Sequence, residues 1–436
     1  MKILNISLLL FTVTSFFFGC TSDDSNDNDT DNYTPKAPVV QKRSIKRGAS
    51  FDYQYVDDIN ALGKGMSWSY NWGISQSASF DGAMKENNME YFPMAWNGVN
   101  KDALREYVKN HPETEYLLAF NEPNLTDQAN MTPQEAAAKW GDVKSIADEL
   151  GLKIISPAMN YGTLPNYSNP IKWLDEFFAL VPIDDIDGIS IHCYMPNASA
   201  LKSYVELFKK YKKPIWLTEF CAWDGLNQDS FTPEGQQKHL SDVFNYLESD
   251  PDIERYAWFI PRAGNVDGFP YMSLLTRSAN VELTELGKIF TQMSSQDKST
   301  FYVEQQTVEA EHYSSISIAD GLEGGWAKGP RVKTTTDAPN ESLELYDFLP
   351  KQWVEYQFEV DRTKDFILEL RYACFVDSEI RIEVDGKPET TFLLNNTDRE
   401  FIWNNAEVPV KLSSGKHTIR IFLNSGKFHL NWLKLY

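Results

Sequence analysis

Two glutamates end mainly apolar segments in distant parts of the chain. Glu122 follows the run YLLAFN (116–121), and Glu219 follows PIWLT (214–218). Carboxylates at the ends of buried parallel strands lie at the edge where active sites of barrel proteins are built. Such a pair can break a glycosidic bond, because a protonated carboxyl helps the leaving oxygen depart while an ionised one attacks the anomeric carbon or activates water. The acid needs a pKa above the usual value of about 4.3 for glutamate, which burial and a neighbouring negative charge supply.

The chain around these glutamates alternates between short apolar runs and helical patterns. Eight strands are predicted, at residues 47–51, 65–72, 89–96, 116–122, 153–159, 186–194, 214–220 and 255–261. Between them, a capping box at residues 132–135 (TPQE) opens a helix that stops at Gly151, TPE (232–234) opens another, and residues 283–290 form the last. Alternating strands and helices predict a parallel sheet, and eight strands in about 245 residues predict a (β/α)8 barrel. An open doubly wound sheet fits less well, because no glycine-rich phosphate turn follows the first strand.

The two glutamates end the fourth and seventh of these strands. Because side chains alternate along a strand, Glu122 shares a face with Leu118 and Phe120. Glu219 likewise shares a face with Leu217. If these apolar residues fill the barrel, both carboxylates point toward its axis at the upper rim.

Other residues near the strand ends are candidates for the same site. His192 lies two residues before Tyr194 and therefore on the same face, with either a role in the site or a place in the core. Trp258, on the eighth strand, either floors the site or belongs to the core. Three further tryptophans are candidate platforms for sugar rings, with a core role as the alternative: Trp72, Trp96 and Trp223.

The composition and the missing motifs exclude several functions. A net charge of −21 speaks against a nucleic-acid partner, since a phosphate backbone requires a cationic surface. Aromatic residues make up 14% of the chain, which is consistent with large cores or with ring surfaces that hold sugars. The sequence contains no HExxH, P-loop or GxSxG motif, and its histidines show no metal-ligand spacing. We therefore expect catalysis without a cofactor.

The first residues have the features of an export signal. Lys2 is followed by an apolar run (3–18), then Gly19-Cys20 and an acidic stretch. This arrangement resembles a bacterial lipoprotein signal, which implies that Cys20 is lipidated and becomes the new N-terminus. The aspartate-rich residues 21–45 predict a disordered tether. The expected location is the cell envelope, with a lipid anchor in the outer membrane or at the cell surface, and the other cysteines are expected to be free thiols.

After Ser294 the pattern changes from helical to period two. In WVEYQFEV (353–360), Val354 and every second residue after it are apolar, and the residues between them are polar. Half-buried antiparallel strands produce this alternation. The predicted organisation is a signal at 1–20, a tether at 21–45, a (β/α)8 barrel at 46–293, a linker at 294–302 and an all-β β-sandwich at 303–436.

Several spaced motifs carry a resemblance to a known family. They are KRGASF (46–51), MSWSYNWG (66–73), YFPMAWNG (91–98), YLLAFNEPN (116–124) and PIWLTEF (214–220). Together they resemble glycoside hydrolase family 128, whose members cleave β-1,3-glucans internally, over residues 46–290. The resemblance implies Glu122 as general acid/base and Glu219 as nucleophile of a retaining mechanism. It also implies that Asn121 contacts the sugar 2-hydroxyl and that Tyr194 orients Glu219.

The C-terminal segment resembles carbohydrate-binding module family 6. The matching pieces are VEAEHYSS (308–315), WVEYQFEV (353–360), LELRYA (368–373), IEVDGK (382–387), SGKHTIRIFL (414–423) and FHLNWLKLY (428–436). The resemblance implies a sugar clamped between Trp403 and Tyr346, although His429 stands where the family commonly has Asn or Asp. It also implies a structural Ca²⁺ held by oxygens of Glu309, Glu311 and Asn431, the alternative being a solvated acidic strand edge.

These observations predict a lipid-anchored, monomeric endo-β-1,3-glucanase whose β-sandwich holds the polysaccharide. Its partners would be the β-glucan and the membrane that receives the lipid. One alternative keeps the enzyme and changes the substrate to another β-linked glycan. A second alternative is a glycan-binding surface protein without turnover, which the presence of both glutamates disfavours.

Overall fold

The computed structural model describes residues 36–223, 232–263, 271–318, 329–337 and 342–436. Residues 36–436 form one compact unit. The expected signal, Cys20 and the tether up to residue 35 lie outside the described residues. Within the described ranges, no helix is long and apolar enough to cross a membrane, and Cys193, Cys221 and Cys374 are buried free thiols.

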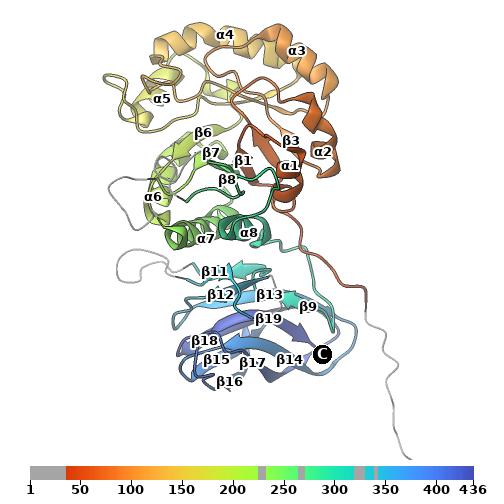
Figure 1. The fold of residues 1–436 in the computed structure, drawn as a ribbon. Helices are drawn as coiled ribbons and strands as arrows, with labels where there is room; N and C mark the ends of the chain where they lie inside the picture. The colour runs from red at the N-terminus through yellow and green to blue at the C-terminus, as the bar shows by residue number, and fades with distance from the viewer. Residues whose placement is uncertain (1–35, 224–231, 264–270, 319–328, 338–341) are drawn as a thin grey trace, which may run out of the picture. The chain divides into compact units, whose positions relative to one another are not determined.

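The first part of the described chain is a closed barrel of parallel strands (Figure 1). The strands are β1 (Arg47–Ser50), β2 (Trp68–Tyr70), β3 (Glu90–Tyr91), β4 (Tyr116–Leu118), β5 (Lys153–Ile155), β6 (Ile189–Cys193), β7 (Ile215–Phe220) and β8 (Ile253–Trp258). Six of them pair in the order β3-β2-β1-β8-β7-β6, and β4 pairs with β5. Parallel bridges from Met94 to Leu118 and from Met159 to Ile191 join the two groups and close the ring. The eight predicted strands and the (β/α)8 fold are confirmed.

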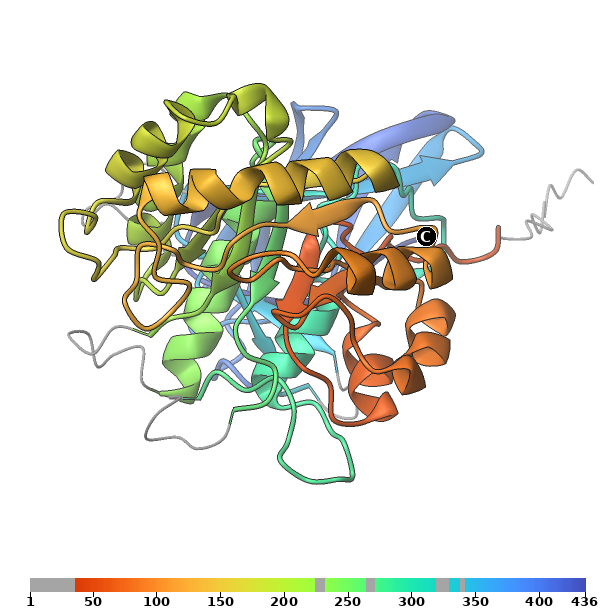
Figure 2. The same ribbon diagram turned by 90° about the horizontal axis from the view of Figure 1, so that it is seen from above.

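Helices surround the barrel, as the view in Figure 2 shows. They are α1 (Val56–Leu62), α2 (Asp81–Glu86), α3 (Lys101–Asn110), α4 (Pro133–Leu150), α5 (Pro170–Phe178), α6 (Ala198–Phe208), α7 (Pro233–Ser249) and α8 (Glu285–Gln292), with short 3-10 turns at Ala78–Phe80, Ile183–Asp185 and Lys209–Tyr211. Thr132 caps α4 in a capping box with Glu135, and Gly151 ends the helix at a φ of 71°, which glycine adopts without strain. Thr232 caps α7 through the Gly235 N–H. The predicted helix starts are therefore confirmed.

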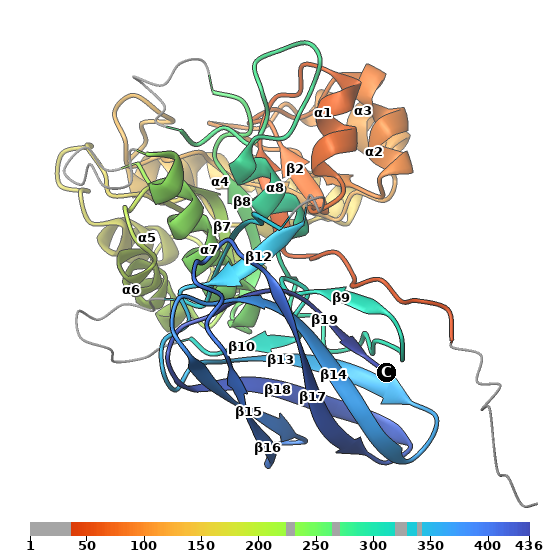
Figure 3. The ribbon, with the colours of Figure 1, turned by 60° about the horizontal axis from the view of Figure 1, so that its bottom comes forward.

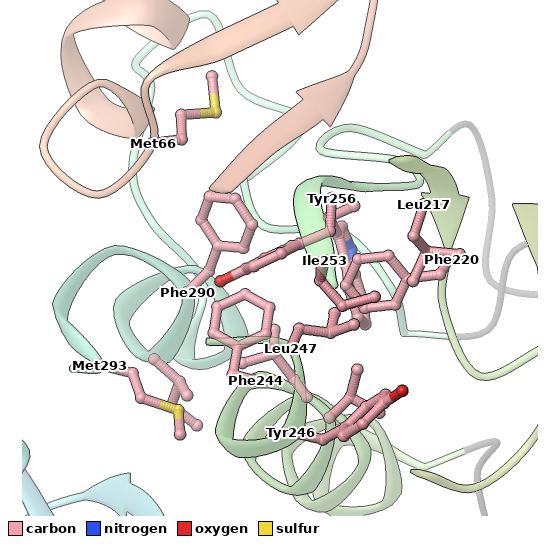
Figure 4. Close-up of a cluster of buried hydrophobic side chains, with 14 of the residues drawn as sticks. Met66, Leu217, Phe220, Phe244, Tyr246, Leu247, Ile253, Tyr256, Phe290 and Met293 are labelled. Carbon is pink, nitrogen blue, oxygen red and sulfur yellow. The ribbon is translucent and has the colours of Figure 1, made fainter. Parts of the chain in front are cut away.

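The barrel interior and the layer under the helices have separate cores. The interior cluster consists of Trp68, Tyr70, Phe92, Met94, Leu118, Ile155, Trp216 and Ala257. Leu217 instead belongs to the cluster in Figure 4, with Phe244 of α7 and Phe290 of α8. Phe120 packs edge-on against Trp140 of α4. The expectation that Leu217 and Phe120 fill the barrel on the same face as the glutamates is wrong.

The reason on the seventh strand is a β-bulge. Ile191 of β6 pairs with Leu217, but the next residue, His192, pairs with Glu219. Thr218 is therefore an extra residue on β7, and it changes the phase of the side chains that follow. Glu219 reaches the barrel axis because of this bulge, not because of simple alternation.

Residues 36–45, which we expected to belong to a disordered tether, make specific contacts. The side chain of Gln306 donates to the Val39 carbonyl and accepts from its N–H. The Arg43 guanidinium donates to the carbonyls of Gly63, Asn87 and Asn88. Because backbone and side-chain groups of this segment have partners, it is ordered, and residue 45 is too late a boundary for the tether.

The C-terminal part is a sandwich of two antiparallel sheets (Figure 3). Its strands are β9 (Thr307–Glu309), β10 (Ser315–Ile316), β11 (Arg331–Thr334), β12 (Leu343–Tyr346), β13 (Trp353–Val360), β14 (Lys364–Ala373), β15 (Ser378–Val384), β16 (Lys387–Leu394), β17 (Asn404–Leu412), β18 (Gly415–Ser425) and β19 (His429–Leu435). One sheet has the order β10-β13-β18-β15-β16, and the other β11-β12-β19-β14-β17, with β9 beside β19. Val354, Tyr356, Phe358 and Val360 are buried, so the predicted alternation is confirmed.

Candidate active site

A cavity of about 470 Å³ lies where the barrel strands end. It is lined by Trp72, Trp96, Asn121, Glu122, Leu125, Asp127, Gln128, Asn160, Tyr194, Glu219, Trp223 and Phe259. The tertiary structure thus brings both predicted glutamates together with Asn121, Tyr194 and the three candidate tryptophans. These residues come from loops or strand ends all around the barrel, which only a closed fold can collect at one place.

Three donors hold the carboxylate of Glu219. The Tyr70 hydroxyl donates to Oε1 at 2.9 Å, the Trp72 indole N–H donates to the same oxygen at 2.7 Å, and the Tyr194 hydroxyl donates to Oε2. Burial, followed by the charge of Glu219, raises the pKa of Tyr70 and of Tyr194 well above 10, so both hydroxyls keep their protons. Three donors on its two oxygens fix the orientation of the Glu219 carboxylate. Glu219 is therefore suited to be the nucleophile.

Glu122 has a different set of partners. His192 Nδ1 lies 2.9 Å from Oε1, and the Asn160 side chain donates to the same oxygen at 3.0 Å. Burial disfavours the carboxylate, but these two partners outweigh it and hold the pKa of Glu122 below its ordinary value. Burial likewise lowers the pKa of His192, but the charges of Glu219 and Glu122 outweigh it and raise that pKa. The expectation that burial and a neighbouring negative charge raise the pKa of the acid is therefore wrong for Glu122, because His192 and Asn160 outweigh them; the proton of the Glu122–His192 pair is favoured on the imidazole.

The two carboxylates are close enough to act on one bond. Single oxygens of Glu122 and Glu219 and a ring nitrogen of His192 all lie within 4.8 Å of one another. Retaining glycosidases hold their two carboxyl groups about 5–5.5 Å apart, whereas inverting enzymes need about 6.5–9.5 Å to admit a water molecule. Carboxylate oxygens within 4.8 Å of each other are consistent with the shorter of these two spacings.

Two residues of the cavity have a left-handed backbone. Trp72 has a φ of 63° and Glu122 a φ of 42°. Side chains other than glycine rarely adopt this region, at a cost of order 1–3 kcal/mol, and such residues concentrate at functional sites. The strain lies at the acid candidate itself and at a donor to Glu219, which supports the location of the site.

Asn121 presents a free acceptor to the site. Its amide nitrogen donates to Gln128 Oε1 at 3.1 Å. Its Oδ1 is buried and has no hydrogen-bond partner among the described residues. A buried acceptor without a partner is costly, so this oxygen is available to a hydroxyl of a bound molecule.

Trp258 does not reach the cavity. It is fully buried, and its indole N–H donates to the Met272 carbonyl at 2.8 Å. The next residue, Phe259, lines the cavity instead and stacks against Trp223 with ring centroids 6.1 Å apart. Of the two interpretations of Trp258, the core role is correct. His192 is also fully buried, but its contact with Glu122 gives it a place behind the reacting groups.

Sequence reasoning missed Asn160 and Phe259. Asn160 directly follows the predicted strand 153–159, so a polar residue at a strand end was a usable signal. Phe259 follows Trp258 directly in the predicted eighth strand, and the sequence did not show which of the two adjacent aromatic side chains points into the site. Gln128, which holds Asn121, lies in a loop and had no signal.

The β-sandwich residues are arranged differently from the expected clamp. Trp403 is only 8% exposed, and its indole N–H donates to Thr336 Oγ1 at 3.1 Å. Tyr346 is half-buried, with its ring edge-on to His429 at 6.1 Å, and His429 is paired with Glu344. Because the Trp403 ring has little free surface, the structure does not support a sugar clamped between Trp403 and Tyr346.

The residues expected to hold calcium fit a cation in part. Glu309 and Glu311 each keep a buried Oε2 without a hydrogen-bond partner among the described residues. Burial, followed by the charge of Glu309, raises the pKa of Glu311 well above its ordinary value. Asn431 Oδ1 already accepts from Ser342. Two unpartnered carboxylate oxygens suit a hard cation, which would remove the repulsion between them.

An eight-stranded βα barrel with two close carboxylates at its strand ends defines a glycoside hydrolase. A family model described as the glycosyl hydrolase catalytic core matches residues 48–290. A solved family 128 subgroup II endo-β-1,3-glucanase from Pseudomonas viridiflava is 36% identical, with 57% of this chain and 98% of that chain covered and a TM-score of 0.52. The corresponding enzyme from Sorangium cellulosum is 35% identical, with 56% and 97% covered and a TM-score of 0.50. The chain belongs to the glycosyl hydrolase catalytic core family and, within it, to glycoside hydrolase family 128.

A curated relative matches the same extent of chain more distantly. Alkali-sensitive linkage protein 1 of Schizosaccharomyces pombe is 26% identical over 263 residues, which cover 58% of this chain and 44% of that protein. The chain therefore spans less than half the length of this relative. Glycoside hydrolases of this family act without a cofactor.

Proposed function

We propose that this protein is an endo-β-1,3-glucanase that acts with retention of configuration. The observation that carries the proposal is the approach of Glu122 and Glu219 to within 4.8 Å in a cavity lined by aromatic rings. The substrate class is supported by the likeness to the two subgroup II endo-β-1,3-glucanases, each at least 35% identical. Glu219 is the proposed nucleophile, and Glu122 the proposed acid/base.

The proposed reaction has two steps. In the first, Glu219 attacks the anomeric carbon and forms a glycosyl ester, while Glu122 gives its proton to the departing glycosidic oxygen. In the second, Glu122 takes a proton from water, and the resulting hydroxide attacks the anomeric carbon and releases Glu219. Tyr70, Trp72 and Tyr194 keep Glu219 oriented before the first step.

The remaining cavity residues would bind the sugar chain. Trp72, Trp96, Trp223 and Phe259 offer apolar faces to the C–H faces of sugar rings. Asn121 Oδ1 would accept a hydrogen bond from the 2-hydroxyl of the sugar that reacts, which satisfies an otherwise unpartnered atom. Interactions with the 2-hydroxyl strengthen in the transition states of these reactions.

The test is a panel of polysaccharides with products separated by linkage and chain length. Laminarin and curdlan should yield a ladder of short β-1,3-oligosaccharides, whose newly formed ends are in the β configuration when first released. Release of glucose alone from chain ends would overturn the endo mode, and α products would overturn retention. Cleavage of a different β-glycan would favour the first alternative. Binding of β-glucans without new reducing ends would favour a surface protein without turnover.

The β-sandwich is proposed to hold the polysaccharide near the catalytic cavity, with Ca²⁺ bound by Glu309 and Glu311. The unpartnered carboxylate oxygens support the cation, whereas the buried Trp403 argues that sugars contact other residues. The test is isothermal titration of the full-length Glu219→Gln protein with laminarin. A second binding event outside the catalytic cavity is expected. One site only would contradict the binding role.

The protein is proposed to lie in the cell envelope, anchored by a lipid on Cys20. It is also proposed to be a monomer. This proposal depends on the sequence pattern at residues 1–20, which lie outside the described residues. Cells grown with radiolabelled palmitate should label the wild type, and Cys20→Ser should abolish both the label and the sedimentation with membranes. Unchanged sedimentation of the variant would contradict the anchor.

A further inference from the structure

We infer that two hydroxyl groups, those of Thr218 and Ser190, form a positioning relay behind the acid/base. His192 Nε2 lies 3.0 Å from Thr218 Oγ1, which in turn lies 2.7 Å from Ser190 Oγ. On its other side the same imidazole contacts Glu122 through Nδ1. The inference rests on the proposed function, because it assigns these hydroxyls to the acid/base role of Glu122.

The β-bulge on β7 creates this relay. Thr218 is the extra residue in the pairing of β6 with β7. Its side chain lies on the interior face with Trp216 and contacts His192, and the bulge brings the next residue, Glu219, to the same side. Thr218 and His192 are fully buried, and Ser190 is 2% exposed. The Ser190 N–H donates to Ser156 Oγ at 2.9 Å, which anchors the end of the relay to the neighbouring strand. Buried polar groups with complete partners hold a single arrangement.

The relay provides a partner for Nε2 of His192 in either protonation state. When the imidazole is neutral and its proton on Nδ1 faces the Glu122 carboxylate, Thr218 donates to Nε2 and accepts from Ser190. When the imidazole is charged, Nε2–H donates to Thr218, which then donates to Ser190. In both states Nδ1–H faces Glu122. This is possible because the Thr218 hydroxyl can either donate to Nε2 or accept from Nε2–H, whereas an apolar side chain can do neither.

This arrangement determines where Glu122 carries its catalytic proton. His192 Nδ1 and the Asn160 amide both end on Oε1. With Oε1 occupied by two donors, protonation takes place on Oε2, the oxygen left for the glycosidic bond. For comparison, removal of a group that orients a metal-ligating side chain typically costs about 10–100-fold in affinity or activity.

The groups that face His192 also determine how the relay responds to pH. Glu122 faces it from the end of β4 and Glu219 from β7, with a 3.5 Å distance between Nδ1 and Oε2 of Glu219. Tyr70 and Tyr194 contact Glu219 rather than the ring. Removal of the Thr218 hydroxyl leaves the Nε2–H of a charged imidazole without an acceptor. The alkaline limb of kcat/KM should therefore move to lower pH in Thr218→Val.

The test compares two substrates that differ in their need for an acid. Thr218→Val should lower kcat/KM for laminarin by about 10–100-fold, the range for such positioning groups. For laminaribiosyl fluoride, whose leaving group needs no proton, kcat/KM should change by less than about threefold, since a general acid gives no advantage there. Thr218→Ser should restore laminarin hydrolysis, and Ser190→Ala should have the same selectivity as Thr218→Val with a smaller loss.

A matched control is Thr291→Val. Thr291 is also buried, and its hydroxyl donates to the Gly287 carbonyl within α8. It should leave both substrates and the pH profile unchanged. Equal losses on both substrates in Thr218→Val would mean that the hydroxyl acts through Glu219 or through the fold, and would overturn the relay.

A spectroscopic readout separates this inference from the proposed function. In the wild type, the imidazole ¹⁵N shifts of His192 should show a protonated Nδ1 at every pH. In Thr218→Val the titration of the ring should move to lower pH, and if the protein does not fold, Thr218→Ala provides the same comparison. A ring protonated only on Nε2 in the neutral wild type would overturn the relay even if laminarin is cleaved. Conversely, a protein without activity on any β-1,3-glucan would refute the function and leave this measurement valid.

Discussion

The surroundings of Glu122 and Glu219 differ although both are buried glutamates at strand ends in one cavity. Glu219 is bound on both oxygens by donors that stay protonated, namely two tyrosines and an indole. Within the described residues Glu122 is bound through one oxygen, and one of its partners is a histidine that can exchange its proton. The same side chain is thus prepared for attack in one place and for proton transfer in the other. Roles in a carboxylate pair are set by neighbours, not by residue type.

The largest expected effect comes from the nucleophile. Glu219→Gln should lower kcat for both laminarin and laminaribiosyl fluoride by at least about a thousandfold, because neither substrate can form the glycosyl ester. Initial rates with both substrates measure this. If hydrolysis of either substrate were undiminished, Glu219 would not be the nucleophile.

Glu122→Gln should separate the two substrates. Laminarin hydrolysis should fall by about 10²–10⁴-fold, the usual contribution of a general acid, whereas formation of the ester from laminaribiosyl fluoride should persist. Added azide should then release a β-glycosyl azide, because it attacks the ester without needing a base. An α-azide, or equal losses on both substrates, would reverse the assignment of the two glutamates.

Tyr194→Phe should weaken the nucleophile without affecting the acid. A hydrogen bond to a charged group contributes about 1.5–3 kcal/mol, which corresponds to a loss of about 10–100-fold. Because the bond ends on Glu219, the loss should be similar for laminarin and for the fluoride. A loss confined to laminarin would place Tyr194 with the acid. Tyr204→Phe is the control, since its hydroxyl donates to the Met159 carbonyl.

His192 and His239 are both buried, and they should give opposite trends of stability with pH. The pKa of His192 is raised above 6.5 by Glu219 and Glu122 in spite of burial, and the pKa of Glu122 is held below 4.5. The contribution of His192 to stability is therefore complete below about pH 6.5 and is lost as pH rises through the raised pKa of His192. At the acid end, the contribution is lost as pH falls through the lowered pKa of Glu122. Relative to His192→Asn, the wild type should gain most between about pH 4.5 and 6.5.

His239→Asn is the matched control for this series. Burial lowers the pKa of His239 to about 3, so this ring stays neutral and costs stability as pH falls below 6.5. As pH falls from about 6.5 to 4.5, the wild type should therefore lose stability relative to His239→Asn. Over the same range it should gain stability relative to His192→Asn. Unfolding midpoints from denaturant titration at several pH values measure both trends. Parallel trends would contradict the charged pair at His192.

A second carboxylate pair, in the β-sandwich, should show the smallest effect. The Oε2 atoms of Glu309 and Glu311 have no hydrogen-bond partner among the described residues, and burial raises the pKa of Glu311. Ca²⁺ at about a hundred times its Kd should raise the Tm by about 2–4 °C, more at pH 8 than at pH 5 because protons compete. Glu311→Gln should abolish the rise and Glu369→Gln, on the surface of β14, should not. An equal rise in both variants would exclude this site.

The sequence alone determined the eight strands, the capped helices, the period-two sandwich and the presence of a glutamate at the ends of the fourth and seventh strands. These features are local, because propensity, caps and periodicity act over a few residues. The facing of Leu217 and Phe120, the bulge at Thr218 and the contribution of Phe259 were decided only by the tertiary structure. A bulge is a mismatch between two paired strands and a cavity is the meeting of many loops, so neither can be read from one segment of chain.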